Sequence, residues 1–220
     1  MHRARYLVQS VFTEKTDRIL FTTYTANLAK NIESNLGNLC GDEGERVEVV
    51  HLHSWAVRFM RTQGIEFNIV NDKHKNECWQ EAVAVPDEVD WDIGFLRQEW
   101  EQVIQTHGIS DKQKYLRISR VGRGKTLSRP QRAKIWEVFA EYREALRSRG
   151  KFEWLDVIRE TRRYLEEKQH LLPYRSLVVD EAQDFHIEEW RLIRCLVPEG
   201  KNDLFIVGDA HQRIYGRRVV

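Results

Sequence analysis

Two short, wholly apolar runs in the C-terminal part of the chain constrain the fold more than any other feature. Residues 177–179 read Leu-Val-Val and residues 204–207 read Leu-Phe-Ile-Val, and each run ends at a polar turn. A strand that is apolar on both faces is typical of a sheet covered on both sides, and such sheets are parallel with helical connections. Residues 187–196, between the two runs, have helical spacing. We therefore predict an α/β fold built on a parallel sheet.

The first sixty residues continue this alternation of helix and strand. Apolar residues at helical spacing indicate helices that end at Gly41 and Gly64, and β-rich runs separate them. The expected helices span 2–13, 28–39 and 54–62, and the expected strands span 19–23 and 46–52.

The middle of the chain has a different pattern. It holds five of the seven tryptophans and no strand signal, and Ser128 and Pro130 open an amphipathic helix that ends at Gly150. A second helix follows at 152–168. We predict an all-helical subdomain inserted into the α/β framework. The expected divisions are 1–64 and 171–220 for the two parts of the framework, and 65–170 for the insertion.

Composition excludes several classes of protein. The 220 residues carry 35 Lys and Arg against 34 Asp and Glu, so any affinity for nucleic acid has to come from local clusters of charge. No stretch approaches the ~20 apolar residues of a membrane-spanning helix. The three cysteines lie far apart without a CxxC pair, which argues against a disulfide framework or a zinc site. We expect a cytoplasmic protein without a membrane partner.

The pair Asp180-Glu181, directly after the first apolar run, is the strongest chemical signal. Ligands of open α/β sheets bind at the carboxyl ends of the strands, where this pair is expected. In nucleotide hydrolases the first acid of such a pair holds Mg²⁺ and the second activates the attacking water. The alternative is that both acids only favour the N-terminus of the next helix.

The second apolar run leads into Gly208-Asp209, followed by Gln212 and Tyr215. An amide at this place is able to contact a γ-phosphate and to report its presence. The alternatives are an ordinary β-turn at Gly208-Asp209 and a tyrosine that belongs to the core.

Four segments, in order, resemble the UvrD/Rep-type superfamily 1 DNA helicases. The family segments TFTNKAA, TFHSFA, a Walker B sequence and VGDxxQSIY have counterparts at residues 23–29, 51–56, 179–184 and 207–215. The resemblance covers essentially the whole chain, including a long helical insertion between the second and third segments. It implies a RecA-like P-loop NTPase sheet.

The resemblance also implies roles for individual residues. Asp180 would bind Mg²⁺, Glu181 would be the catalytic base, and Gln212 would contact the γ-phosphate of ATP. Where the family has an aromatic residue, this chain has Arg217, which could stack by its guanidinium plane or bind phosphate. The residues implied to line the path of single-stranded DNA are Thr23, Tyr24, Thr25, His53, Ser54, Trp55, Tyr215 and Arg217.

The chain also departs from the family, because no phosphate loop of the form GxxxxGK[ST] precedes residue 1. Residues 122–126 read Gly-Arg-Gly-Lys-Thr, but Ser119 stands where the first glycine is required and no apolar strand precedes it. We interpret this stretch as an exposed loop that either faces DNA or is a solvated group of charges. The sheet is thus expected to lack its P-loop strand.

The motifs of a second motor domain are missing as well. We expect a fragment of an ATP-dependent DNA helicase that moves 3′ to 5′ on single-stranded DNA and at duplex junctions. The isolated chain is expected to be monomeric and inactive as an ATPase. The alternative is a non-catalytic DNA-binding or protein-interaction module derived from a helicase.

Overall fold

The computed structural model describes residues 1–86, 91–120, 125–168 and 172–209. The chain divides into two compact units, which are described separately. The sheet unit comprises Met1–Glu66 and Val157–Val220, and the helical unit comprises Phe67–Asp156. The expected insertion, 65–170, differs from the helical unit mainly at residues 157–168, which belong to the sheet unit.

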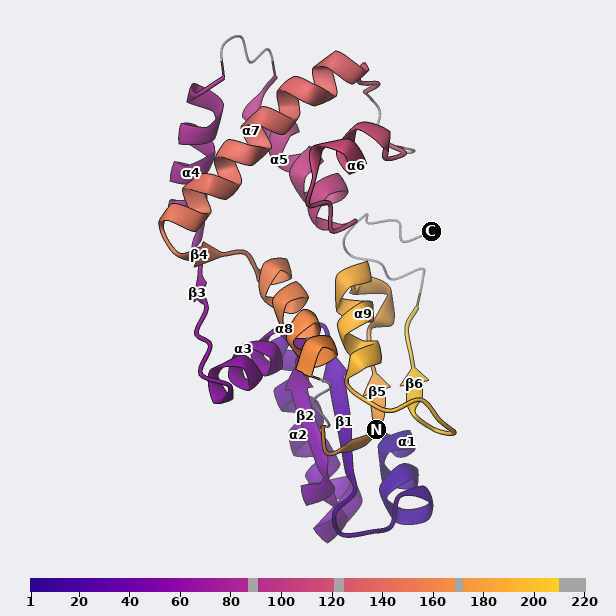
Figure 1. The fold of residues 1–220 in the computed structure, drawn as a ribbon. Helices are drawn as coiled ribbons and strands as arrows, with labels where there is room; N and C mark the ends of the chain where they lie inside the picture. Colours follow the sequence, from indigo (N-terminus) through magenta and orange to yellow (C-terminus); the bar gives the residue numbers. More distant parts are fainter. Residues whose placement is uncertain (87–90, 121–124, 169–171, 210–220) are drawn as a thin grey trace. The chain divides into compact units, whose positions relative to one another are not determined.

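Four parallel strands form the sheet, in the order β2-β1-β5-β6 (Figure 1). Strand β5 pairs with β1 on one side and with β6 on the other. Leu177 lies opposite Leu204, so the two apolar runs of the sequence are neighbours, and the predicted parallel α/β sheet is confirmed. The strands are β1 (Arg18–Thr23), β2 (Val47–His51), β5 (Tyr174–Val179) and β6 (Leu204–Ile206).

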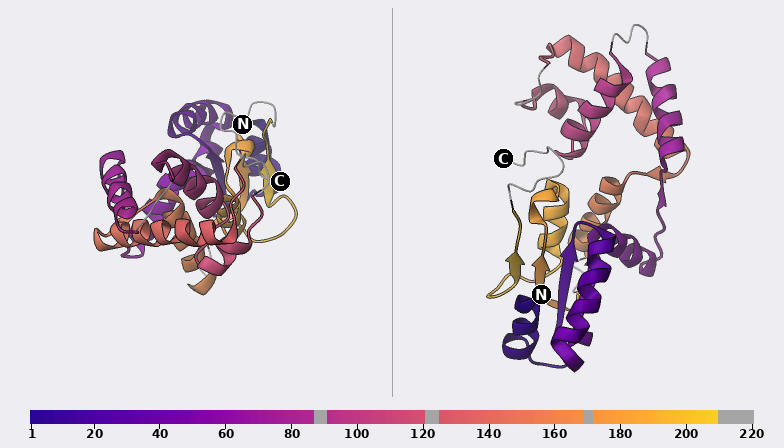
Figure 2. Two further views of the ribbon diagram at one scale, coloured as in Figure 1. Left: turned by 90° about the horizontal axis from the view of Figure 1, so that it is seen from above. Right: turned by 180° about the vertical axis from the view of Figure 1, so that it is seen from behind.

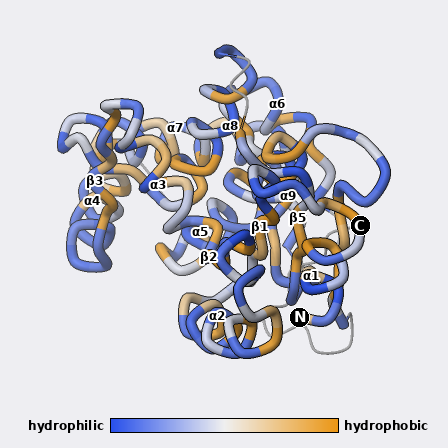
Figure 3. The backbone as a smooth tube through the Cα atoms, turned by 90° about the horizontal axis from the view of Figure 1, so that it is seen from below, coloured by the Kyte–Doolittle hydropathy of each residue, from blue (hydrophilic) through white to orange (hydrophobic). Residues whose placement is uncertain are grey.

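Helices cover both faces of the sheet (Figures 1 and 2). Helix α1 (His2–Tyr6), the π-helical turn that follows it (Leu7–Val11) and α2 (Ala26–Cys40) pack on one face, against side chains such as Phe21 and Val178. Helices α8 (Trp154–Lys168) and α9 (Ile187–Cys195) lie on the other face. Figure 3 shows the hydrophobic stretches of β1 and β5 between these layers. Because helices cover both faces of the sheet, the side chains on both sides of its central strands are mostly buried and apolar.

Local signals set the ends of the elements near the sheet edge. The Thr25 hydroxyl accepts a hydrogen bond from the Leu28 N–H and caps α2, which ends at Gly41 in a positive-φ conformation (+58°). A 3₁₀ turn (Gly41–Arg46) leads to β2, and α3 (Leu52–Thr62) follows. Helices α2 and α3 therefore end close to Gly41 and Gly64, as the sequence predicted, and Gly64 also has a positive φ.

The helical unit is built around aromatic side chains. Trp79 stacks on Tyr142 with ring centroids 4.0 Å apart, and Trp100 and Phe139 pack against them edge to face. Besides helices, the unit contains one short parallel pair of strands, β3 (Asn68–Ile69) and β4 (Lys151–Phe152). The helices are α4 (Asp72–Ala84), α5 (Ile93–Glu99), a π-helical turn (Trp100–Gln105), α6 (Lys112–Arg117) and α7 (Arg129–Ser148).

A buried carboxylate, Glu153, links four parts of the helical unit. It accepts hydrogen bonds from Trp100 Nε1 (2.7 Å), Gln105 Nε2 (2.5 Å) and the Tyr142 hydroxyl (3.1 Å). The Lys75 ammonium lies 3.1 Å from the same carboxylate. Burial and the neighbouring Glu153 charge raise the pKa of Tyr142. Burial alone lowers the pKa of Lys75, but Glu153 and Glu101 together outweigh it, and the net direction is upward.

None of the helices in the described ranges is long and apolar enough to cross a bilayer.

Candidate functional site

Asp180 and Glu181 lie at the carboxyl edge of the sheet, directly after β5. The Asp180 N–H donates to the Thr22 carbonyl (2.9 Å), which continues the β1–β5 pairing to the end of the strand. Glu181 has a left-handed backbone (φ +53°), and the chain then turns into a 3₁₀ helix (Ala182–Asp184). Both acids are half-buried. Non-glycine residues in this conformation persist where their surroundings over-determine them, which is typical of functional sites.

The acid pair does not cap the next α-helix. Helix α9 begins at Ile187, and its first turn is capped by His186 and Glu189 through a reciprocal pair of hydrogen bonds. The acids that favour the helix N-terminus are thus Glu188 and Glu189, not the pair at the strand end. This geometry argues against the alternative interpretation of Asp180 and Glu181.

An amide joins the two motif segments. Gln183 Nε2 donates to Glu181 Oε2 (2.6 Å), and Gln183 Oε1 accepts from the Asp209 N–H (3.0 Å). The Ala182 N–H donates to the Val207 carbonyl (3.0 Å) beside this bridge. Sequence reasoning missed Gln183, although its place two residues after Glu181, within the same turn, was a usable signal.

The donor set at this edge fits a magnesium–nucleotide complex better than a metal site made of protein alone. Within the described residues no group of three or more His, Cys, Asp or Glu side chains is arranged to hold a metal. Mg²⁺ commonly keeps several waters and is bound by one or two carboxylates together with substrate phosphates. Asp180 offers such a carboxylate at this edge, and Glu181 lies directly beside it.

The end of β1 and the loop that follows it hold three residues of the predicted DNA path. Thr25 is exposed, and Tyr24 is half-buried with its ring edge on Phe185, at a centroid distance of 5.8 Å. Thr23 is fully buried, and its hydroxyl has no hydrogen-bond partner among the described residues. Tyr24 and Thr25 therefore have surface available for a ligand, whereas Thr23 does not.

The first turn of α3 holds the next three residues of the predicted DNA path. Ser54 is exposed, and its hydroxyl lies 3.2 Å from His51 Nδ1. His53 Nε2 lies 3.1 Å from the buried carboxylate of Glu189, which ties α3 to α9. Trp55 is only 3% exposed, because it stacks on Phe59 and donates to the Tyr174 hydroxyl (3.0 Å). Its ring belongs to the core and presents no face to a base.

Burial and the neighbouring His53 ring lower the pKa of His51, and Glu189 opposes this only in part. His51 therefore favours its neutral form near neutral pH, where it can still donate or accept a hydrogen bond.

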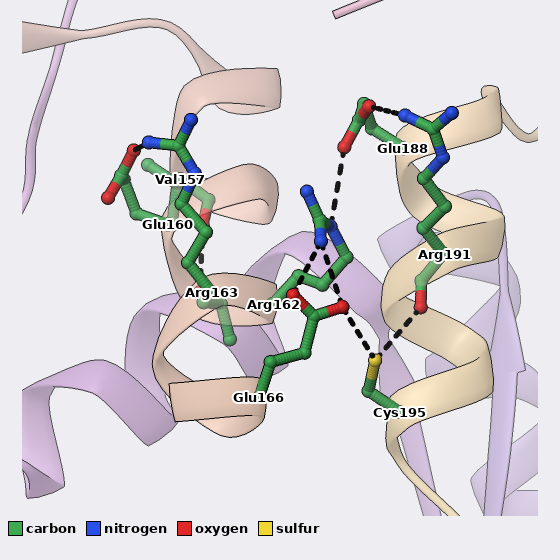
Figure 4. Close-up of polar contacts among 9 residues, drawn as sticks. Val157, Glu160, Arg162, Arg163, Glu166, Glu188, Arg191 and Cys195 are labelled. Atoms are coloured by element: carbon green, nitrogen blue, oxygen red, sulfur yellow. Dashed lines mark hydrogen bonds and ion pairs between the residues drawn. The ribbon is translucent and has the colours of Figure 1, made fainter. Parts of the chain in front are cut away.

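Polar contacts between α8 and α9 keep α9 in place over the sheet (Figure 4). The Arg162 guanidinium contacts Glu166 on its own helix (2.7 Å) and Glu188 on α9 (3.5 Å). Cys195 Sγ lies 3.7 Å from Glu166 Oε1. Burial, reinforced by the Glu166 charge, raises the pKa of the Cys195 thiol. These contacts of α9 therefore support the structure, and Glu189, next to Glu188 in the first turn of the helix, contacts His53.

The remaining predicted site residues, Gln212, Tyr215 and Arg217, lie outside the described residues, as does most of the 122–126 loop.

Comparison with known proteins identifies the family. The UvrD/REP helicase N-terminal domain matches residues 1–219. The ATP-dependent DNA helicase UvrD1 of Mycobacterium tuberculosis (strain ATCC 25618 / H37Rv) is 26% identical over 214 residues, which cover 91% of this chain and 28% of that protein. The ATP-dependent DNA helicase PcrA of Staphylococcus aureus (strain NCTC 8325 / PS 47) is 25% identical over 237 residues, covering 99% of this chain and 30% of PcrA. This chain thus spans less than a third of either relative, and it belongs to the UvrD/REP helicase N-terminal domain family.

Proposed function

We propose that the chain is the first motor region of an ATP-dependent DNA helicase that couples hydrolysis of Mg-ATP to 3′–5′ movement on single-stranded DNA. One observation carries the proposal: β5 and β6 are neighbours, so the acid pair and the Gly208-Asp209 segment meet at one edge of the sheet. Ligands bind at this edge in open α/β sheets. Family membership and the names of the relatives support ATP and DNA as ligands.

In this proposal Asp180 holds Mg²⁺ and Glu181 accepts the proton of the attacking water. The bound ion would neutralise charge on the phosphates. Gln212, three residues after Asp209 in the sequence, contacts the γ-phosphate. The half-buried position of the two acids supports these roles, because a carboxylate there has limited contact with water and is still accessible to a ligand.

The proposed DNA path uses exposed residues of two segments, the loop after β1 and the first turn of α3. Thr25 and Ser54 offer hydroxyls for phosphates, and Tyr24 offers a ring for stacking, which contributes about 1–3 kcal/mol per base. Tyr215 and Arg217 extend the path in sequence. Thr23, His53 and Trp55 are proposed to act indirectly, by fixing the end of β1 and the start of α3 that present these residues. Single-stranded DNA and duplex junctions are the proposed partners of a monomeric protein.

No strand among the described residues pairs with the outer edge of β6, which supports the proposal that a further strand completes this sheet. Phe205, Ile206 and Val207 are 37%, 51% and 44% exposed, although a parallel α/β sheet normally buries such residues. The proposed strand is the one that carries the phosphate loop, whose backbone amides supply most of the phosphate binding. Without it, the 220-residue chain is proposed to be inactive as an ATPase.

The test compares the purified chain with its Glu181→Gln variant. We expect neither to hydrolyse ATP above background, with or without single-stranded DNA. Activity that the Glu181→Gln substitution removes would contradict the proposed inactivity and would support catalysis by this pair.

A titration with nucleotide, with and without Mg²⁺, tests the alternative of a non-catalytic DNA-binding or interaction module. Weak binding that needs both Mg²⁺ and Asp180 favours the motor region. Single-stranded DNA binding without any Mg²⁺-dependent nucleotide binding favours the alternative. Sequencing the gene upstream of the Met1 codon adds an independent test, because an in-frame GxxGxGKT would place this chain inside a larger helicase.

A further inference from the structure

Gln183 occupies a position that the proposed roles of Asp180, Glu181 and Gln212 do not use. Its side chain lies between the acid turn after β5 and the turn after β6. The donor side of the amide contacts the Glu181 carboxylate, and the acceptor side contacts the Asp209 N–H. We propose that Gln183 is a positioning residue that fixes the Glu181 carboxylate relative to the Gly208-Asp209 segment. The inference rests on the proposed role of Glu181 as the base.

The two partners define the orientation of the amide. A carboxylate only accepts hydrogen bonds and a backbone N–H only donates, so the Nε2 atom has to face Glu181 and the Oε1 atom has to face Asp209. Glutamate at this position could accept from Asp209 but would place a second negative charge against Glu181. Glutamine is therefore the side chain that satisfies both partners at once.

Close packing holds the bridge in place. A Cβ atom on Gly208 would lie 2.7 Å from Gln183 Oε1 and 2.9 Å from Ala182 Cβ, so any larger residue there would displace the amide or the turn. The Ala182 N–H bonds to the Val207 carbonyl (3.0 Å), and the Val207 N–H bonds to the Val179 carbonyl (2.8 Å). The two turns thus approach each other through backbone contacts, and Gln183 is the side chain that spans them.

This arrangement has a mechanical consequence. One oxygen of the Glu181 carboxylate is held by Gln183, which restricts rotation of the carboxylate and gives its other oxygen a defined direction. A shift of the Gly208-Asp209 segment moves the acceptor end of the amide and, with it, the donor end. Contact between a γ-phosphate and the residues after Asp209 would therefore be transmitted to the base.

Amide hydrogen exchange measured by NMR on the 220-residue chain tests the bridge directly. Gln183→Leu removes the acceptor, and we expect the Asp209 amide to exchange about 10-fold faster, as for the loss of one hydrogen bond. Gln183→Glu keeps an acceptor, and we expect exchange at Asp209 close to that of the unmodified chain. The side-chain carboxyl resonance of Glu181 should nevertheless shift in Gln183→Glu, because this variant lacks the Nε2 donor that contacts Glu181.

Gln63→Leu is the matched control, because it removes another bridging amide of the sheet unit, one that accepts from the Tyr164 hydroxyl (3.0 Å). It should leave exchange at Asp209 and the Glu181 resonance unchanged. Unchanged exchange at Asp209 in Gln183→Leu, or equal acceleration in Gln183→Leu and Gln183→Glu, would overturn the proposal.

Titration of the same samples with Mg²⁺ and ATPγS separates this inference from the proposed function. In the unmodified chain we expect the Asp180 and Asp209 amide resonances to shift together, and in Gln183→Leu only that of Asp180. A joint shift that survives in Gln183→Leu would refute transmission through Gln183. No shift at Asp180 in the unmodified chain would count against the nucleotide site itself, and the exchange data would still decide the bridge.

Discussion

Two carboxylates, one in each unit, show how a structural and a functional acid differ. Glu153 in the helical unit is buried. It accepts hydrogen bonds from an indole N–H, an amide and a hydroxyl group, and it pairs with the Lys75 ammonium. Glu181 in the sheet unit is half-buried, sits on a left-handed backbone and receives a hydrogen bond from Gln183. A carboxylate can accept about four hydrogen bonds. Glu153 is saturated, whereas Glu181 retains capacity for water or a ligand.

An acid that is buried and has all its hydrogen-bond acceptor sites occupied, as Glu153 has, is suited to a structural role. Asp180 and Glu181 lie where a ligand can reach them, and the strain at Glu181 has no counterpart at Glu153. The following predictions test this contrast.

The largest expected effect is at Glu153. Glu153→Leu leaves the Trp100, Gln105 and Tyr142 donors and the Lys75 ammonium without their acceptor, and we expect a loss of about 3–5 kcal/mol in the stability of the helical unit. Urea unfolding followed by tryptophan fluorescence measures it. Glu101→Leu is the control, because the exposed Glu101 carboxylate also lies near Lys75 (3.4 Å) yet should cost little. Equal losses in both variants would remove the contrast.

The second-largest effect is expected at alkaline pH, which should lower the free energy of unfolding of the helical unit. The raised pKa of Tyr142 means that the unfolded chain loses this proton near pH 10 while the folded chain keeps it, so stability falls as pH rises above about 10. The net raised pKa of Lys75 acts in the same direction, because its contribution is complete below its unfolded pKa and is lost as pH rises through the folded one. The slope is at most about 1.4 kcal/mol per pH unit for each group.

Urea unfolding at several pH values between 8 and 11 gives this slope. Tyr142→Phe removes one titrating group, so the variant should lose less stability per pH unit than the unmodified chain. An unchanged slope would show that Tyr142 does not titrate on unfolding.

Helix caps should give an intermediate effect in both units. The Ser128 hydroxyl caps α7 in a capping box with Gln131, and the Thr25 hydroxyl caps α2. We expect Ser128→Ala and Thr25→Ala each to cost about 1 kcal/mol in unfolding experiments. A DNA-binding role for Thr25 thus has to be tested with Thr25→Ser, which keeps the cap. Weaker DNA binding by Thr25→Ala with full binding by Thr25→Ser would assign the hydroxyl rather than the methyl group.

The smallest change in stability is expected at Glu181. Glu181→Gln keeps the shape of the side chain and loses only a charge at a half-buried place, so we expect a change within about 0.5 kcal/mol. Thermal unfolding of the chain measures it. A loss comparable to that of Glu153→Leu would show that Glu181 is itself a structural acid.

The sequence predicted much of this fold because its signals were local. The apolar runs at 177–179 and 204–207 identified two strands, Gly41 and Gly64 ended two helices, and Ser128 opened α7. Such features depend on residues a few positions apart, which periodicity and capping rules describe.

The site was less predictable, because several of its contacts join distant parts of the chain. The pairing of His53 with Glu189 and the hydrogen bond from Trp55 to Tyr174 depend on how α3 packs, which no local pattern encodes. The second hydrogen-bond partner of Gln183, the Asp209 N–H, follows β6, so it could be identified only once the pairing of β5 with β6 was known. The position of the acid pair, in contrast, followed from one strand alone.

The short β3–β4 pair described above has a practical consequence for protein engineering. Asn68 lies opposite Lys151 and Ile69 opposite Phe152, so the chain enters and leaves the helical unit through adjacent strands (Figure 1). An inserted module whose two ends are already neighbours can be exchanged as a cassette, with a brief linker closing the gap. The sheet unit and the tryptophan-rich helical unit could thus be expressed, exchanged and evolved separately.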